Sequence, residues 1–262
     1  MIDLHTHILP GVDDGADTED ESVEFVRMAL QDGVRTIVAT PHCNEGSYFN
    51  QLSDIQAGVR RLQQRLIRED LELELVPGAE VHLCPDLVER VRDGRAPTLG
   101  NNGKTLLLEL SLTQYPVELA NLIFQLKLAG LEILLAHPER IRYFQEDRKR
   151  YEDVVRIGAY GQITAGSILG TFGKRARAYS EELLREGLIH VVASDAHSLR
   201  GRPPVLTPAI EQMIPLVGEQ RARSMADGIP RALVAGKTPD VPPVDGAPAR
   251  HRSFLSRLFR NG

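Results

Sequence analysis

Tryptophan is absent from this chain of 262 residues, and cysteine and aromatic residues are scarce. Two cysteines, Cys43 and Cys84, are too few to build a disulfide scaffold, and this usage fits a reducing cytoplasm. No apolar run approaches the roughly 18 residues needed to span a membrane, and no export signal follows Met1. The net charge of -5 argues against a general nucleic-acid surface. We therefore expect a soluble, cytoplasmic protein with no nucleic-acid partner.

Seven apolar runs, rich in β-branched residues or leucine, have the character of strands covered on both faces. They lie at residues 2–7, 35–40, 73–80, 105–110, 132–136, 160–165 and 189–194. Segments with helical spacing separate them, including 21–31, 54–68, 117–128 and 180–185. A glycine directly before the next strand ends most of these helices, as at Gly33, Gly130, Gly158 and Gly187. Repeated strand–helix units without hairpin signals predict an α/β fold, a single-domain distorted (β/α)7 TIM-like barrel.

The predicted barrel occupies residues 1–238, because 207–237 has the pattern of a helical cover after the last strand. Residues 239–262 are predicted to be a proline-containing linker and a basic amphipathic tail. In the tail an apolar stripe lies among arginines and consists of Phe254, Leu255, Leu258 and Phe259. Such a segment could dock on the inner face of an anionic membrane or pack against a neighbouring subunit, and the sequence leaves both open.

Nine potential metal ligands fall where the predicted strands end. They are His5, His7, Asp14, His42, Glu80, Glu109, His137, Asp195 and His197. The C-terminal ends of barrel strands meet on one face, and residues i and i+2 of a strand point the same way, so the two imidazoles of the His-x-His motif can reach one ion. For any single position a polar rim residue is an equal alternative. Taken together, the nine indicate a polynuclear metal site.

The donor types narrow the chemistry of this site. Nitrogen and oxygen ligands without thiolate suit Mn, Fe, Zn or Mg, and the imidazoles favour the transition metals. Four carboxylates would neutralise two divalent ions, whereas three ions carry six positive charges and leave a net charge of +2. That excess favours a dianionic substrate such as a phosphate ester, for which a metal-activated hydroxide is a suitable nucleophile.

Cys84 and Arg90 have the Cys-x5-Arg spacing of cysteine-dependent phosphatases, but the surrounding residues do not fit that loop. Such a loop points backbone N–H groups at phosphate. Pro85 has no N–H, and Asp86 and Glu89 would repel a dianion. Pro85 and Asp86 instead suit the start of a helix, so Cys84 is predicted not to be a nucleophile.

The ordered motifs HTH, DDG, TPH, GAE, LLEL, AHPER and SDAH, within residues 1–205, resemble the PHP (polymerase and histidinol phosphatase) superfamily. Asp14 and Glu109 stand where many members have histidine. With GRPP at 201–204, this is similar to the bacterial manganese-dependent tyrosine-protein phosphatases of capsule and exopolysaccharide operons. The resemblance implies a phosphoric monoester hydrolase acting on phosphotyrosine proteins, with a bacterial tyrosine kinase that controls polysaccharide synthesis as its partner.

The resemblance also implies which residues do what. There would be three divalent ions, with manganese preferred over Fe, Zn or Mg. The first would be held by His5, His7, Glu80 and Asp195, the second by Glu80, Glu109 and His137, and the third by Asp14, His42 and His197. Arg140 and Arg202 would bind the phosphate, which the planar fork of a guanidinium suits.

Other functions stay open at this point. The metals could serve a small ester such as histidinol phosphate or a nucleic acid end, although Asp14, Glu109 and the acidic chain argue against these. An amidohydrolase-like barrel often uses a carbamylated lysine, but the five lysines, at 104, 127, 149, 174 and 237, fall in predicted helices, loops or strand starts. The alternative from another class is an inactive barrel that serves as a binding module.

Some neighbouring residues are ambiguous. Asp13 could replace Asp14 as the ligand if the register shifts by one residue, and Glu139 is either an acid of the site or a rim charge. His82 is expected in a loop and His190 in a strand.

Overall fold

The protein is represented by a computed structural model that describes residues 1–44 and 46–245. The tail predicted at 250–262, with its apolar stripe, lies outside the described residues. The strands are β1 (Ile2–Thr6), β2 (Thr36–Ala39), β3 (His42–Cys43), β4 (Glu74–Pro77), β5 (Glu80–His82), β6 (Thr105–Glu109), β7 (Glu132–Ala136), β8 (Tyr160–Thr164) and β9 (Val191–Ala193). The helices are α1 (Glu19–Gln31), α2 (Leu52–Arg68), α3 (Leu87–Arg92), α4 (Leu119–Leu128), α5 (Arg142–Glu146), α6 (Arg148–Ile157), α7 (Ala165–Leu169), α8 (Gly173–Arg185), α9 (Thr207–Val217), α10 (Glu219–Ser224) and α11 (Gly228–Val234), with 3-10 turns η1 (Leu99–Asn101) and η2 (Pro138–Arg140).

The strands pair in parallel in two sheets, with the orders β1-β2-β4 and β3-β5-β6-β7-β8-β9. The predicted α/β fold with parallel strands is thus confirmed. Two expectations need correction. The run predicted at 73–80 is divided into β4 and β5, and the run at 35–40 is followed by the short strand β3, which was not predicted. The four glycines expected to end helices, Gly33, Gly130, Gly158 and Gly187, all have positive φ, as the left-handed turn requires.

Backbone hydrogen bonds connect the two sheets at both sides. Where β2 passes into β3, the Gly78 N–H donates to Ala39 O at 2.9 Å and the Glu80 N–H donates to Pro41 O at 3.1 Å. Beyond β9, the Asp195 N–H donates to His5 O at 2.9 Å, so this segment lies beside β1. The strands therefore follow one another in the circular order that a distorted barrel requires.

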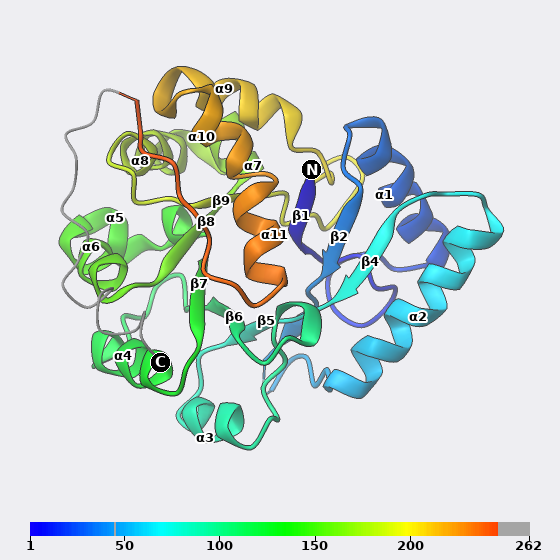
Figure 1. The fold of residues 1–262 in the computed structure, drawn as a ribbon, viewed down its shortest axis with the longest axis horizontal. Coiled ribbons are helices and arrows are strands. Elements are labelled where there is room, and N and C mark those ends of the chain that lie inside the picture. Colours follow the sequence, from blue (N-terminus) through cyan, green and yellow to red (C-terminus); the bar gives the residue numbers. More distant parts are fainter. Residues whose placement is uncertain (45, 246–262) are drawn as a thin grey trace.

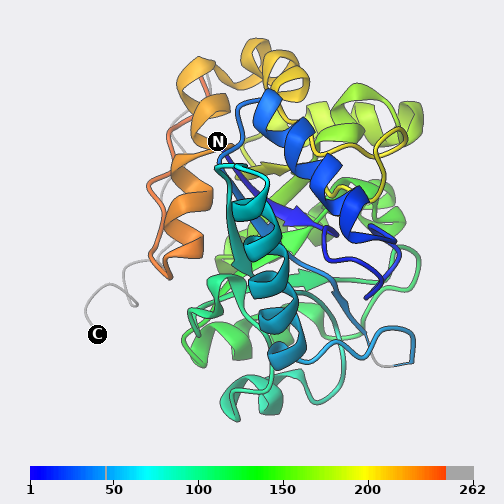
Figure 2. The same ribbon diagram turned by 90° about the vertical axis from the view of Figure 1, so that its right-hand side faces the viewer.

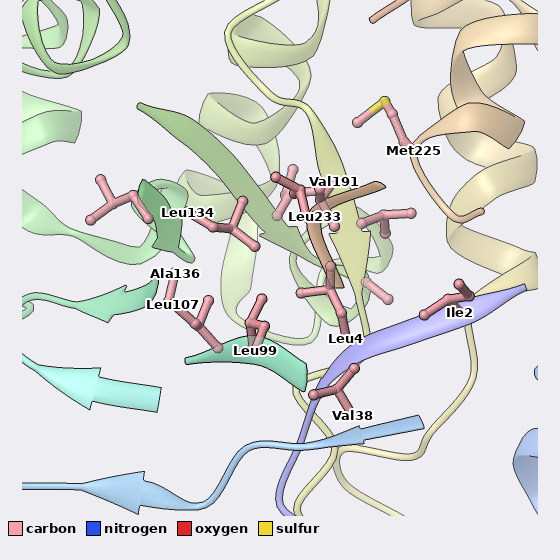
Figure 3. Close-up of a cluster of buried hydrophobic side chains, with 14 of the residues drawn as sticks. Ile2, Leu4, Val38, Leu99, Leu107, Leu134, Ala136, Val191, Met225 and Leu233 are labelled. Atoms are coloured by element: carbon pink, nitrogen blue, oxygen red, sulfur yellow. The ribbon is translucent and has the colours of Figure 1, made fainter. Parts of the chain in front are cut away.

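The N-terminal ends of the strands are covered by α11 and by the residues directly before it. Thr105, the first residue of β6, donates its hydroxyl to Leu233 O at 2.7 Å, and the Ile2 N–H at the start of β1 donates to Ala226 O at 2.9 Å. Leu233 is fully buried and packs with Leu4 and other strand residues in the apolar cluster of Figure 3. This packing leaves the opposite, C-terminal ends of the strands for the polar residues of the site.

The long helices lie outside the strands (Figure 1). Helices α1 and α2 run side by side along β1, β2 and β4, as Figure 2 shows, whereas α4, α6 and α8 cover the β6–β8 side. None of the helices in residues 1–44 and 46–245 combines the length and apolar content that crossing a bilayer requires.

Candidate metal centre

The nine residues predicted as metal ligands lie near the C-terminal ends of β1, β2, β4, β6, β7 and β9 or in the segments that follow these strands. His5 lies in β1, His42 and Glu80 begin the short strands β3 and β5, and Glu109 ends β6. The others follow strands or lie in the turn after β1, namely His7, Asp14, His137, Asp195 and His197. Direct contacts between side chains connect all nine into one cluster.

Four donor groups face one another in the buried middle of the cluster. His5 Nε2 lies 3.2 Å from His7 Nε2, 3.3 Å from Glu80 Oε2 and 3.5 Å from Asp195 Oδ1. His7 Nε2 lies 3.5 Å from the same Glu80 oxygen and 3.6 Å from Asp195 Oδ1. These four side chains are the set that the resemblance assigns to the first metal. A fifth residue, Gln162 of β8, orients His5, because its Oε1 lies 2.9 Å from His5 Nδ1.

Glu80 is the central carboxylate. Its Oε2 lies 3.0 Å from His42 Nδ1, and its Oε1 lies 2.9 Å from His137 Nε2. Glu109 Oε2 lies 3.6 Å from His42 Nδ1, and donor atoms of His42, Glu80 and Glu109 all lie within 4.8 Å of one another. The resemblance assigns His137 to the second metal with these two carboxylates. In the structure His42 also reaches them.

The two aspartates of the DDG motif face different partners. Asp14 Oδ1 lies 3.4 Å from both His42 Nε2 and His197 Nε2, and with His7 these residues form a third group of donors within 4.8 Å. Asp13 Oδ2 instead lies 2.7 Å from His7 Nδ1 and accepts the His42 N–H at 3.0 Å. Asp13 therefore orients two imidazole-bearing residues from behind, while Asp14 faces the donor group.

The turn that carries both aspartates depends on Gly15. The chain folds back so closely that the Ala16 N–H donates to His7 O at 3.0 Å. A Cβ atom on Gly15 would lie 2.0 Å from that same carbonyl oxygen. Any side chain there would displace the turn and move Asp13 away from His7.

Two of the candidate ligands have left-handed backbone conformations. His137, directly after β7, has φ 34°, and Asp195, just after β9, has φ 53°. This conformation is uncommon for residues other than glycine and persists only where surrounding contacts hold it. The strain therefore coincides with the two positions where the chain leaves a strand and turns a donor into the cluster.

Arg140 and Arg202, the predicted phosphate ligands, converge on one side of the cluster. Arg140 Nη1 lies 2.8 Å from Asp195 Oδ2, and Arg202 pairs with the same oxygen. Both guanidinium groups also face the ring of Phe172, with their carbon atoms 4.2 and 5.6 Å from its centroid. Neither arginine is fully buried, so each has N–H groups available for a substrate anion. Phe172 was not predicted, because it belongs to no motif.

The carboxylates give the cluster a negative electrostatic environment. Burial disfavours a charged imidazole, but at His5 the Glu80 and Asp195 carboxylates outweigh burial and raise the pKa to about 9. At His42 burial also lowers the pKa, but the Glu109 and Glu80 carboxylates outweigh burial and raise the pKa to about 11. Burial would raise the pKa of Glu109, yet His42 and His82 lower it to about 2. Positive charge is thus favoured at His5 and His42, whereas burial lowers the pKa of His197 at the edge of the centre.

The residues present fit a group of divalent metal ions. Glu80 Oε2 is buried and makes no hydrogen bond within the described part of the chain, although imidazole nitrogens of His5, His7 and His42 lie 3.0 to 3.5 Å from it. A cation shared by these groups would satisfy that oxygen. Nitrogen and oxygen donors without thiolate match divalent transition metals. Because imidazole binds a metal in its neutral form, metal uptake would displace the protons that the carboxylates favour.

His82, His190 and Glu139, which the sequence places near the candidate ligands, each make a defined contact. His82 lies in β5 rather than in a loop, and its Nδ1 lies 3.2 Å from Glu109 Oε2. His190 precedes β9 rather than lying in it, and its Nδ1 accepts the Gly161 N–H at 3.0 Å. Glu139 is fully buried and accepts hydrogen bonds from the Thr164 N–H and the Ser167 hydroxyl.

Cys84 is not a member of this donor cluster. Helix α3 begins at Leu87, and the Arg90 guanidinium donates to Asp86 Oδ2 at 2.8 Å. The arginine that would bind phosphate in a cysteine-dependent phosphatase is therefore paired with the carboxylate directly before its own helix.

A parallel α/β fold with imidazoles and carboxylates clustered beyond the C-terminal strand ends is typical of barrel enzymes, and these donors suit metal ions. Residues 1–235 match the family described as capsular polysaccharide synthesis, CpsB/CapC. The chain belongs to this family.

Its relatives carry related names. The sequence is 40% identical over 202 residues to tyrosine-protein phosphatase YwqE of Bacillus subtilis (strain 168), covering 77% of this chain and 79% of that protein. It is 30% identical over 234 residues to tyrosine-protein phosphatase CpsB of Streptococcus agalactiae serotype V, covering 86% and 94%.

Solved structures agree in fold. One from work on YwqE of Bacillus subtilis and CpsB of Streptococcus pneumoniae, described as metal-dependent tyrosine phosphatases, superimposes with a TM-score of 0.88 at 34% identity, covering 95% of this chain and 100% of that one. Histidinol phosphate phosphatase of Lactococcus lactis, at 10% identity and a TM-score of 0.52 over 84% of this chain and 93% of that one, is similar in fold alone.

Proposed function

We propose that this chain is a metal-dependent protein-tyrosine phosphatase. The observation that carries the proposal is the convergence of Arg140 and Arg202 on Asp195, a carboxylate whose other oxygen faces His5 and His7. A set of metal donors and a pair of phosphate-binding side chains therefore share one residue. The names of the relatives in the same family support phosphotyrosine as the substrate.

Three divalent ions would bind, with manganese preferred and Fe, Zn or Mg as alternatives. The first would be held by His5, His7, Glu80 and Asp195, the second by Glu80, Glu109 and His137, and the third by Asp14, His42 and His197. When bound, the ions supply an activated water for attack on phosphorus and positive charge beside the phosphoryl oxygens. Asp13 and Gln162 hold the rings of His7 and His5 in place through their other nitrogens.

Arg140 and Arg202 would bind and orient the phosphate through paired N–H donors, which match the oxygens of a dianion. The leaving phenolate needs little protonation, because the pKa of a tyrosine side chain is about 10. The site therefore requires no strong general acid. The nearby acid Glu139 is buried and accepts hydrogen bonds from Thr164 and Ser167.

The partner would be a bacterial tyrosine kinase that controls capsule or exopolysaccharide synthesis. The family description, capsular polysaccharide synthesis, supports this proposal. The catalytic unit would be residues 1–238, on which the start of 239–262 packs as far as Asp245, and the rest of that segment would bring it to an anionic membrane surface or to a second subunit.

Metal analysis combined with a phosphopeptide assay tests the proposed activity. We expect the purified full chain to hold three transition-metal ions and to hydrolyse a phosphotyrosine peptide faster than histidinol phosphate or a phosphoserine peptide, with loss of turnover after chelation. Metal-independent turnover, or preferred hydrolysis of histidinol phosphate, would refute the proposal.

The role of the tail has a separate test. Residues as far as Asp245 pack on the barrel, since Val244 is buried and Arg221 binds Pro242 O, so a truncation should end after Asp245. We expect the full chain to co-sediment with anionic vesicles at low salt and the truncated chain to remain in solution, with equal turnover of a small aryl phosphate. Equal sedimentation would exclude the membrane role, and loss of an oligomer on truncation would favour subunit packing.

A further inference from the structure

A cavity of about 240 Å³ adjoins the candidate metal centre on its β3–β5–β6 side. His42 and Glu109 belong both to the donor cluster and to the wall of this cavity. The rest of the wall comes from the end of β5 and from the segments that follow β3 and β6, and consists of Asn44, Ser47, Tyr48, His82, Leu110, Ser111 and Leu112. The cavity therefore borders the donor cluster directly, at two of the residues that would hold the metal ions.

Tyr48 forms a flat aromatic wall. Its ring stacks on His42, with 5.5 Å between centroids and 15° between planes. The turn that carries it is fixed by reciprocal backbone hydrogen bonds between Asn44 and Tyr48, both of 3.0 Å, and by the Asn50 side chain, which donates to His42 O at 2.8 Å. This segment projects from the body of the protein between β3 and α2 (Figure 2).

Leucines supply the apolar part of the opposite wall. Leu110 is fully buried, whereas Leu112 is 38% exposed and offers apolar surface to a ligand. The main chain at Leu112 is held in place, because its carbonyl accepts the Arg142 N–H at 2.8 Å. An aromatic ring entering the cavity would cover Leu112 and lie near the face of Tyr48.

The size of the cavity limits what it accepts. Pockets for drug-sized ligands have volumes of about 300 to 1,000 Å³, so this one suits a single ring. In an aryl phosphate only the ester oxygen separates phosphorus from the ring, which places the ring directly beside the donors that bind the phosphoryl group. A phosphoserine side chain has a single methylene at that position and would leave the cavity to water.

We propose that this cavity is the aryl subsite of the enzyme, in which Tyr48 and Leu112 bind the ring of phosphotyrosine and so select aryl over alkyl phosphates. The proposal rests on the proposed function, because it assigns the substrate side chain of the same site. It adds specificity-determining residues that do not bind metal or phosphate.

Binding of two non-hydrolysable probes tests the subsite without relying on turnover. The ratio of the dissociation constant of methylphosphonate to that of phenylphosphonate, measured by calorimetry on the metal-loaded full chain, reports the contribution of the ring alone. We expect phenylphosphonate to bind more tightly to the wild type. Tyr48→Ala and Leu112→Ala should each reduce the ratio, by roughly ten-fold for the loss of the aromatic wall.

Two further variants complete the test. Tyr48→Phe keeps the ring and should retain the ratio. Phe49→Ala is the matched control, because Phe49 is the adjacent aromatic residue, is 75% exposed and does not line the cavity. A wild-type ratio in both alanine variants of the cavity, or an equal loss in Phe49→Ala, would overturn the subsite.

The outcomes separate the two proposals. If the ratio falls as expected but the wild type does not hydrolyse a phosphotyrosine peptide, the proposed function fails while the aryl subsite stands. If the peptide is hydrolysed and the ratio is unchanged in Tyr48→Ala and Leu112→Ala, the function stands and the subsite is wrong.

Discussion

Replacing Arg202 by alanine tests the phosphate-binding side of the site. Arg202 and Arg140 contact the same oxygen of Asp195 and keep only 23% and 19% of their side chains exposed. A charge-assisted hydrogen bond in such a partly desolvated position contributes about 1.5 to 3 kcal/mol. That free energy corresponds to a roughly 10- to 150-fold loss in kcat/KM, which we expect for Arg202→Ala with a phosphotyrosine peptide.

Companion variants identify the cause of this loss. Arg202→Lys keeps the charge but not the planar fork, so it should recover only part of the activity. Adding Arg140→Ala should cost less than the product of the single effects, because both arginines share Asp195 and the Phe172 ring. Steady-state kinetics with metal analysis of each variant makes the measurement. Wild-type kcat/KM in Arg202→Ala, with metals still bound, would show that Arg202 does not bind the substrate.

Glu80→Ala should abolish turnover and lower the metal content, since the carboxylate faces several imidazoles at once, and unchanged metal content would contradict the proposed site. Cys84→Ser should leave turnover near the wild-type rate, and thiol alkylation should not inhibit; inhibition through Cys84 would revive a cysteine mechanism. Burial and Arg221 lower the pKa of the His190 imidazole in the folded protein to about 3, whereas its pKa in the unfolded chain is near 6.5. The neutral imidazole therefore contributes its full stability above pH 6.5, and this contribution is lost as the pH falls toward 3. In chemical denaturation His190→Gln should be less stable than the wild type at pH 8, and this deficit should shrink below pH 6.5 by up to about 1.4 kcal/mol per pH unit; a deficit independent of pH would refute the shift.

The strands could be predicted where burial on both faces gives a continuous apolar run. Residues 105–110 and 132–136 correspond closely to β6 and β7, because all but one side chain of each strand is buried. The two residues of β3 could not be predicted, since a strand of that length has no periodicity. Their pairing with β5 depends on contacts distant in sequence, where the Glu80 N–H donates to Pro41 O.

The residues of the motifs predict where the candidate ligands lie, whereas the grouping of these ligands around separate ions followed only from the family resemblance. Each donor follows an apolar run, and parallel strands bring such ends together whatever the intervening sequence. Which aspartate of the DDG motif faces the donors is decided by the close approach of Gly15 to His7 O, a tertiary contact. Gln162 carried a weak signal, as a polar residue inside a buried strand, and Phe172 carried none.

Asp195 couples the metal donors to the two arginines, because each of its oxygens faces one of these groups. Its Oδ1 faces His5 and His7, whereas its Oδ2 accepts from Arg140, Arg202 and, at 3.4 Å, the Thr164 hydroxyl. An incoming phosphate must therefore compete with Oδ2 for the guanidinium groups or use their remaining N–H donors, and each guanidinium has several of these. Any N–H withdrawn from Oδ2 leaves more negative charge on Asp195, which strengthens it as a cation ligand while the substrate binds. Phosphate binding and metal binding should thus reinforce each other through this one carboxylate.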